Sequence, residues 1–147
     1  AGIVERLWGS PCDPKTMNAL ALAFVGDGVF ELLVREKLSC ESRLPVSQLH
    51  RQAVERVCAR QQAVDGQRLW PHLTEEEQQV YRRGRNARVH HVPKHANVAD
   101  YHAATALETL FGYLYLLGAL SRVRELFALL TQEPKETGEG PEEKRES

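Results

Sequence analysis

The sequence predicts an all-α domain, folded as a compact bundle of helices. Apolar residues recur at helical spacing in five segments, and no segment shows the apolar-polar alternation of a half-buried strand. With 42% hydrophobic residues among 147, the chain can bury a core of its own. It contains no apolar run long enough to span a membrane. Three scattered cysteines do not suggest a disulfide framework, and they favour a reducing, cytoplasmic setting.

The first three predicted helices are defined by their apolar spacing and by one strong cap. Residues 17–38 are apolar almost all round, which predicts the central helix of the bundle. A second helix is expected over residues 46–64. The third begins with Thr74 and Glu77, whose side chains are spaced to form a capping box with the backbone amides of the first turn, and it ends near Asn86.

Two further helices complete the expected bundle. One begins at Asn97, a favourable N-cap residue, carries Asp100 in its first turn and ends at residue 117, before Gly118. The other covers residues 121–131. Helices of this length joined by short links are typical of an all-α bundle.

The last fifteen residues differ from the rest of the chain in composition. Residues 133–147 hold six Glu against three basic residues and no large apolar side chain, which predicts a disordered acidic tail. Residues 1–132 hold sixteen Lys and Arg against fourteen Asp and Glu. We therefore expect one folded domain over residues 1–132, followed by the tail over residues 133–147.

Two of the predicted helices carry an acid beside a glycine in an otherwise apolar stretch. Asp27 lies between Gly26 and Gly28, and Glu108 precedes Gly112 by one helical turn. Glycine allows close approach of helices, so one interpretation is that Asp27 and Glu108 meet across a helix contact and bind Mg²⁺. The other is that Asp27 is exposed at a kink and Glu108 lies on a solvated face. Spacing alone leaves both interpretations open.

A third acid, Glu31, lies one turn after Asp27. It has the spacing to share a carboxylate site with Asp27, and equally the spacing to form a surface ion pair with Arg35. We expect the surface pair with Arg35.

A basic loop is expected over residues 82–95. It holds five positive charges and three His, and no acid occurs over residues 82–99. Arg and Lys clustered in this way favour a phosphate backbone, because each neutralised phosphate releases counterions. A solvated face is the alternative. The candidate RNA contacts are Arg82, Arg83, Arg85, Asn86, Arg88 and Lys94.

Three of these segments together resemble a known family. Residues 20–31, LALAFVGDGVFE, resemble the signature helix of the ribonuclease III catalytic domain, and residues 105–116, TALETLFGYLYL, resemble its second acidic motif. Two further features resemble the Mini-ribonuclease III subfamily. One is the sequence RGRNA at residues 83–87, and the other is that no double-stranded-RNA-binding domain follows these motifs. The resemblance covers residues 17–118.

The resemblance implies a ribonuclease III-like homodimer that cleaves double-stranded RNA with Mg²⁺, for which Mn²⁺ would substitute. A metal-activated water would attack phosphorus, leaving 5′-phosphate and 3′-hydroxyl ends. It further implies maturation of the base-paired ends of 23S ribosomal RNA precursor in the cytoplasm, sometimes assisted by a large-subunit ribosomal protein.

The resemblance also assigns roles to individual residues. The parent family has four carboxylates per site, and Asp27 and Glu108 match two of them. The other two positions are Ala23 and Thr105 here, so a water held by the Thr105 hydroxyl would replace a missing carboxylate. Phe24 matches an aromatic side chain that crosses the dimer interface in that family.

Two other functions are consistent with the sequence. Because Ala23 and Thr105 replace acids, the chain has the features of an inactive module of the same fold that binds double-stranded RNA or associates with ribosomes. A helical protein-interaction bundle unrelated to RNA is the third possibility.

Overall fold

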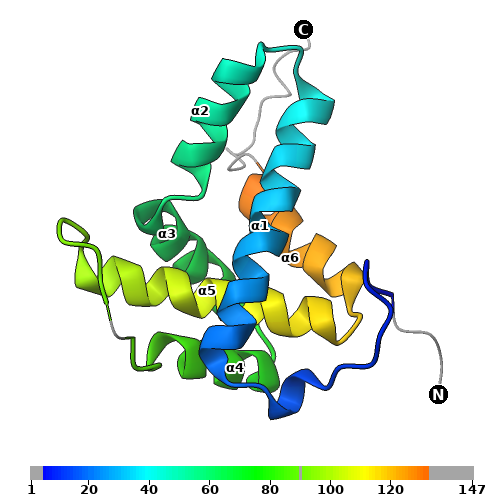
Figure 1. Cartoon of the computed structure of the whole chain (residues 1–147), viewed down its shortest axis with the longest axis vertical. Coiled ribbons are helices and arrows are strands. Elements are labelled where there is room, and N and C mark those ends of the chain that lie inside the picture. The colour runs from blue at the N-terminus through cyan, green and yellow to red at the C-terminus, as the bar shows by residue number, and fades with distance from the viewer. Residues whose placement is uncertain (1–4, 90, 133–147) are drawn as a thin grey trace, which may run out of the picture.

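The computed structural model describes residues 5–89 and 91–132, and within them every regular element is a helix (Figure 1). The predicted all-α fold class is therefore confirmed. No helix among these residues is both long and apolar enough to cross a membrane. In chain order the elements are the 3-10 helix η1 (Pro14–Thr16), α1 (Ala19–Glu41), α2 (Val46–Arg56), α3 (Ala59–Leu69), the 3-10 helix η2 (Trp70–His72), α4 (Glu75–Arg85), α5 (Val98–Leu116) and α6 (Leu120–Thr131).

The core lies around α5, which packs against α1, α4 and α3. Leu107, Leu110 and Phe111 of α5 have no exposed surface. Phe30 of α1 packs edge-to-face against Phe111 and against Phe127 of α6, with ring centres 5.3 and 5.7 Å apart. Figure 1 shows α5 crossing α1 near the middle of the molecule. This crossing decides where the acids of the two helices lie.

Two glycines allow α1 and α5 to cross closely. A Cβ atom on Gly26 would overlap the backbone carbonyl of Glu108, and one on Gly112 would overlap the backbone carbonyl of Leu22. A larger residue at either position would force the helices apart. Gly28 differs, because no heavy atom lies within 4 Å of where its Cβ would be. The fold therefore requires glycine at 26 and 112, whereas contacts within one chain do not require it at 28.

The prediction of a single helix over residues 46–64 is wrong. α2 ends at Arg56, Cys58 has an extended backbone, and α3 begins at Ala59. The break brings the guanidinium of Arg56 onto the fully buried carboxylate of Asp65, with nitrogen–oxygen distances of 2.7 and 3.2 Å. Neither glycine nor proline marks this break in the sequence, so the apolar spacing alone suggested one continuous helix.

The other predicted helices lie where they were expected, with small shifts at their ends. The first begins at Ala19 and continues to Glu41, and the last begins at Leu120. The predicted capping box is present: Thr74 and Glu77 exchange side-chain to backbone hydrogen bonds of 3.0 and 3.1 Å. Asn97 caps α5 through the backbone amide of Asp100.

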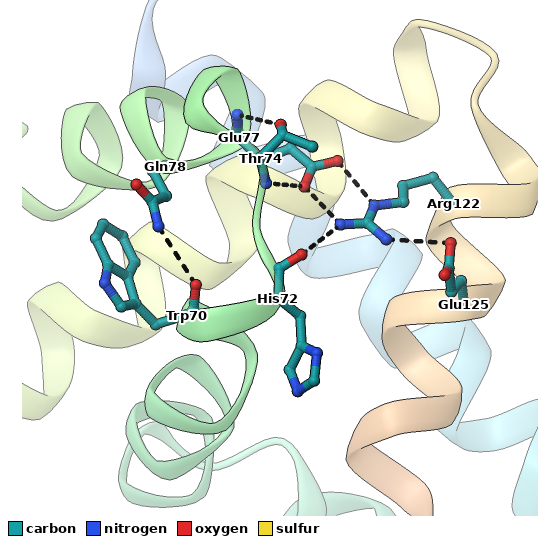
Figure 2. Close-up of polar contacts among 7 residues, drawn as sticks. All are labelled: Trp70, His72, Thr74, Glu77, Gln78, Arg122 and Glu125. Carbon is teal, nitrogen blue, oxygen red and sulfur yellow. Dashed lines mark hydrogen bonds and ion pairs between the residues drawn. The ribbon is translucent and has the colours of Figure 1, made fainter.

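A buried ion pair joins the start of α4 to α6 (Figure 2). Glu77 is 6% exposed, and its two carboxylate oxygens accept hydrogen bonds of 2.9 and 2.8 Å from the guanidinium of Arg122. Arg122 also donates to the backbone carbonyl of His72 and pairs with Glu125 at 3.1 Å. These contacts fix the start of α4 against α6.

The acidic tail expected over residues 133–147 lies outside the described residues. The tail and the domain boundary at residue 132 therefore stay predictions.

Candidate active site

The crossing of α1 and α5 brings Asp27 and Glu108 together. Asp27 follows Gly26 directly, and Gly26 lies against the backbone of Glu108. The Asp27 side chain is exposed, and it is close enough to the half-buried side chain of Glu108 for the two carboxyl groups to share a hydrogen bond. Two acids 81 positions apart in sequence thus lie at one site, with one side open to solvent.

The environment of Glu108 disfavours its ionised form. Burial raises the pKa of Glu108 most, followed by the negative charge of Asp27 and by the hydrogen bond between the two carboxyl groups. A side-chain hydrogen bond from Gln62 acts in the opposite direction, and the resulting pKa is about 8 against an ordinary 4.5. Near neutral pH the pair therefore holds a proton that a cation would displace.

Divalent cations of the hard class fit this pair of residues. Mg²⁺ and Mn²⁺ prefer oxygen ligands, and Mg²⁺ commonly takes only one or two protein carboxylates, with waters and substrate phosphates completing its coordination. Within the described ranges, no group of three or more His, Cys, Asp and Glu side chains is placed to hold a metal. A cation at Asp27 and Glu108 would therefore depend on water and substrate for its remaining ligands.

Ala23 and Thr105, at the two positions that lack a carboxylate, are both buried. Ala23 is 6% exposed and lies one turn before Asp27 on α1. Thr105 is 7% exposed, and its hydroxyl donates a 3.0 Å hydrogen bond to the backbone carbonyl of Tyr101. Because its proton is used there, the Thr105 oxygen can serve a bound water only as an acceptor.

The basic segment begins inside the third predicted helix, which ends near Asn86 as expected, so the loop expected from residue 82 begins only after that helix. Arg82, Arg83 and Arg85 belong to the last turn of α4, and Asn86 is its C-cap residue. The helix continues through Gly84 because this glycine allows α4 to lie against α5, so it marks a close contact and not a break. The two remaining candidates, Arg88 and Lys94, lie between α4 and α5.

A groove of about 950 Å³ lies between the end of α4 and the start of α1. Its charged lining consists of Arg82, Arg83 and Arg88, all exposed. Leu20 also lines it, and Asp27 is seven residues further along α1, which is roughly 10 Å of helix. The basic groove and the acid pair therefore lie along the same half of α1. The remaining lining residues are Asn18, Ala19, Gln79, Asn86 and Ala87.

Two of the candidate RNA-binding arginines also make contacts within the fold. The guanidinium of Arg82 lies 5.2 Å from the centre of the Trp70 ring. Arg83 donates a 2.9 Å hydrogen bond to the backbone carbonyl of Met17, just before α1. These contacts hold both side chains in position at the groove.

Glu31 is not part of the acid pair. Its carboxylate forms an ion pair of 2.7 Å with Arg35, one turn along α1. The expected surface pair is confirmed.

One side of α1 exposes apolar side chains. Phe24 is 83% exposed, Leu20 is 36% exposed and Leu32 is 52% exposed, and the three share one stripe of the helix with Gly28. A large aromatic side chain exposed to this extent is typical of an interaction surface.

Sequence reasoning missed Gln62. This residue of α3 is only 2% exposed, and its side chain lowers the pKa of Glu108. Gln62 lies within the segment that was expected to be one continuous helix, and nothing in its spacing connects it to a residue 46 positions away.

Comparison with known proteins gives a consistent set of similarities. The family model of the ribonuclease III domain matches residues 20–119. A protein named Mini-ribonuclease 3 from Symbiobacterium thermophilum is 46% identical over 114 residues, which cover 78% of this chain and 88% of the relative. Another Mini-ribonuclease 3, from Enterococcus faecalis, is 40% identical over 129 residues, covering 86% and 98%. The crystal structure of a Fusobacterium nucleatum protein matches with a TM-score of 0.72 at 26% identity, covering 82% of this chain and 96% of that protein.

Proposed function

The chain belongs to the ribonuclease III family, in its Mini-ribonuclease III branch, and we propose that it is an endoribonuclease that cuts double-stranded RNA at Asp27 and Glu108. The observation that carries the proposal is the pairing of these two carboxyl groups at the crossing of α1 and α5, where burial and mutual repulsion raise the pKa of Glu108 to about 8. Such a pair weakens the fold unless a cation or a proton neutralises it.

In the proposed reaction Asp27 and Glu108 hold a divalent cation, Mg²⁺ or Mn²⁺. The cation supplies activation of a water and stabilisation of the charge that develops on the phosphate. Asp27 is exposed, so its carboxylate is accessible to a substrate, while Glu108 is half-buried. Hydrolysis breaks the bond between phosphorus and the 3′ oxygen, leaving a 5′-phosphate on one product and a 3′-hydroxyl on the other.

The basic groove is proposed to bind the RNA backbone. Double-stranded RNA is recognised mainly through its shape, its phosphates and its 2′-hydroxyls. The groove is lined by Arg82, Arg83, Asn86 and Arg88, and the other two candidates, Arg85 and Lys94, lie on or next to the same segment. Contacts there would direct a duplex along α1 toward Asp27.

A homodimer is proposed to form through the apolar stripe of α1. Phe24 would enter the second copy, and Gly28 would leave room for a side chain of that copy. Two sites facing one duplex would cut both strands with a stagger.

The proposed substrate in the cell is the base-paired stalk that joins the ends of 23S ribosomal RNA precursor, cut in the cytoplasm. A large-subunit ribosomal protein is the proposed assisting partner. Support for this comes from the similarity to proteins named Mini-ribonuclease 3.

The decisive experiment incubates end-labelled duplex RNA with the protein and Mg²⁺, beside single-stranded RNA of the same sequence. We expect cleavage of the duplex alone, with ends that accept ligation as 5′-phosphate and 3′-hydroxyl. Ala23 and Thr105 favour the second candidate, an inactive duplex-binding module. Retention of the duplex with no cut strand, in either Mg²⁺ or Mn²⁺, would establish that module and exclude the enzyme.

A further inference from the structure

The groove between the end of α4 and the start of α1 is lined by polar side chains of two chemical kinds. Three are arginines, whose positive charges match phosphates. The other three are side-chain amides, from Asn18, Gln79 and Asn86. The described lining of the groove contains no acidic side chain. An amide carries no charge, so attraction to phosphates does not explain why amides stand among the arginines.

Gln79 lies on the same face of α4 as two of these arginines. It precedes Arg82 by three residues and Arg83 by four, so the three side chains share one stripe of the helix. Its neighbour Gln78 is half-buried, and its amide donates to the backbone carbonyl of Trp70 at 3.4 Å. Gln79 is exposed and lines the groove. α4 therefore uses one glutamine for the fold and presents the next one to the groove.

The two arginines beside Gln79 have fixed positions. The guanidinium of Arg82 lies 5.2 Å from the centre of the Trp70 ring, and Arg83 donates a 2.9 Å hydrogen bond to the backbone carbonyl of Met17. One turn of helix separates these arginines from Gln79, which is roughly 6 Å along the axis of α4. A phosphate bound by either arginine would therefore lie at a defined distance from the amide of Gln79.

The amide of Gln79 differs from that of Asn18 in what it offers a ligand. The Asn18 side chain caps α1, because its Oδ1 atom accepts a 2.9 Å hydrogen bond from the backbone amide of Ala21. Only the NH₂ group of Asn18 is left to donate. The exposed amide of Gln79 offers both a carbonyl acceptor and an NH₂ donor.

The 2′-hydroxyl of ribose is a neutral group that requires this combination. It both donates and accepts, and A-form RNA displays it along a wide and shallow minor groove. It lies on the same sugar that carries the 3′ phosphate, so a side chain one helical turn from a phosphate-binding arginine is placed to reach it. DNA has no such hydroxyl.

We propose that Gln79 hydrogen-bonds to a ribose 2′-hydroxyl of a duplex bound in the groove, and that it thereby discriminates RNA from DNA. Arg82 and Arg83 hold phosphates of one strand, and the amide one turn earlier on α4 contacts the neighbouring sugar. This inference deepens the proposed function and rests on it, because it requires duplex RNA in the groove.

The test compares two duplexes of one sequence, RNA and its 2′-fluoro analogue. Fluorine in place of the 2′-hydroxyl keeps the A-form shape and removes the O–H donor. Affinities are measured by filter binding in EDTA, so that no cation supports cleavage. The variants are Gln79→Met, which keeps the side-chain length and removes the amide, and Gln67→Met. Gln67 is an exposed glutamine of α3 that does not line the groove.

Wild type and Gln67→Met should both bind the RNA duplex more tightly than the 2′-fluoro duplex. Gln79→Met should lose about three- to tenfold in affinity for RNA, as expected for one neutral hydrogen bond, and should bind the 2′-fluoro duplex almost as wild type does. Equal losses on the two duplexes, or no loss on either, would overturn the inference and leave the proposed function standing. Failure of wild type to bind the RNA duplex would overturn both.

The dependence of binding on salt separates a sugar contact from a phosphate contact. Arg88→Met removes a positive charge from the groove, so the slope of log affinity against log salt should fall by about one. Gln79→Met should keep the wild-type slope, because a neutral amide releases no counterion. Methionine is a good helix former, so this exposed position should tolerate it, and a melting curve checks the fold. A reduced slope in folded Gln79→Met would overturn the inference.

Discussion

Glu77 and Glu108 belong to the same small helical bundle, but their surroundings shift their pKa values in opposite directions. Burial alone would raise the pKa of Glu77, but hydrogen bonds from Arg122 and from the backbone of Thr74, with the Arg122 charge, hold it below its ordinary value. Burial raises the pKa of Glu108, and Asp27, which lies beside it where Glu77 has a cation, raises it further, to about 8. The fold neutralises the first acid with its own residues. At Glu108 the fold supplies no cation, so the negative charge of the acid pair must be balanced by a proton or by a bound cation.

The comparison teaches how to separate structural acids from functional ones. An acid that is buried with an arginine and a capping box has its charge balanced within the fold, as Glu77 does between α4 and α6 (Figure 2), and removing its partner would destabilise the fold. An acid that is buried beside another acid reduces stability, and is retained for its chemistry. Substitutions at the two locations should therefore have opposite consequences.

The largest expected effect is on catalysis at the acid pair. Asp27→Asn should reduce cleavage of duplex RNA by on the order of a hundredfold or more, because it removes charge at the reacting centre. The same change should leave duplex binding nearly intact and raise thermal stability, since Glu108 loses its repelling neighbour. Single-turnover cleavage, filter binding and a melting curve measure the three quantities, and wild-type cleavage by this variant would remove Asp27 from the mechanism.

The next effect is on stability at the junction of α4 and α6. Arg122→Met should lower the free energy of unfolding by about 3 kcal/mol, because it leaves Glu77 buried without its cation. Urea unfolding near neutral pH measures this change. Arg35→Met, which removes an exposed partner of Glu31, is the control and should change stability by under about 1 kcal/mol. Equal losses in the two variants would contradict the distinction between the junction and the surface.

The pH dependence of stability should differ in sign between the two acids. Without divalent cations, folded Glu108 holds its proton up to about pH 8, whereas the unfolded carboxyl releases it near 4.5. Its contribution to stability is therefore complete below about 4.5 and is lost as the pH rises through 8. Glu77 has a lowered pKa, so its contribution is present above 4.5 and is lost as the pH falls.

Urea unfolding in EDTA, from about pH 5 to about pH 9, checks this prediction with Glu108→Gln as the reference. We expect wild type to lose more stability than Glu108→Gln over that range. Parallel curves for the two proteins would show that Glu108 titrates normally.

The smallest effect is stabilisation by the cation itself. At a Mg²⁺ concentration tenfold above the dissociation constant, linkage predicts a gain of about 1.4 kcal/mol for wild type. Asp27→Asn should lose most of this gain, while Arg122→Met should keep it because its site is elsewhere. Thermal shift with and without Mg²⁺ makes the measurement, and equal shifts in wild type and Asp27→Asn would mean that the ion binds somewhere else.

Local signals in the sequence predicted much of the fold and little of the contacts within it. Thr74 with Glu77, and Asn97, mark helix starts through interactions within four residues, and all three cap as expected. Gly26 and Gly112 are visible as small residues in apolar helices, but only the structure shows that they face each other. The family resemblance, by contrast, depends on the order of motifs and needs no contact.

The errors have physical causes of the same kind. The break between α2 and α3 is fixed by Arg56 and Asp65, which carry no helix-breaking signal. Gly84 falls within the basic segment that was expected to be a loop from residue 82, yet it lies in a helix because α5 packs against it. Gln62 reaches Glu108 through tertiary packing alone. Contacts between distant positions determine these three features, and apolar periodicity does not report them.

The central claim is that Asp27 and Glu108 jointly hold a divalent cation. The most direct test is an anomalous difference map from crystals of the protein soaked in Mn²⁺. The account predicts a peak within ligand distance, about 2.2 Å, of a carboxylate oxygen from each of the two acids. A map with no peak there under conditions in which the protein cuts RNA, or a peak bound by other residues, would contradict it.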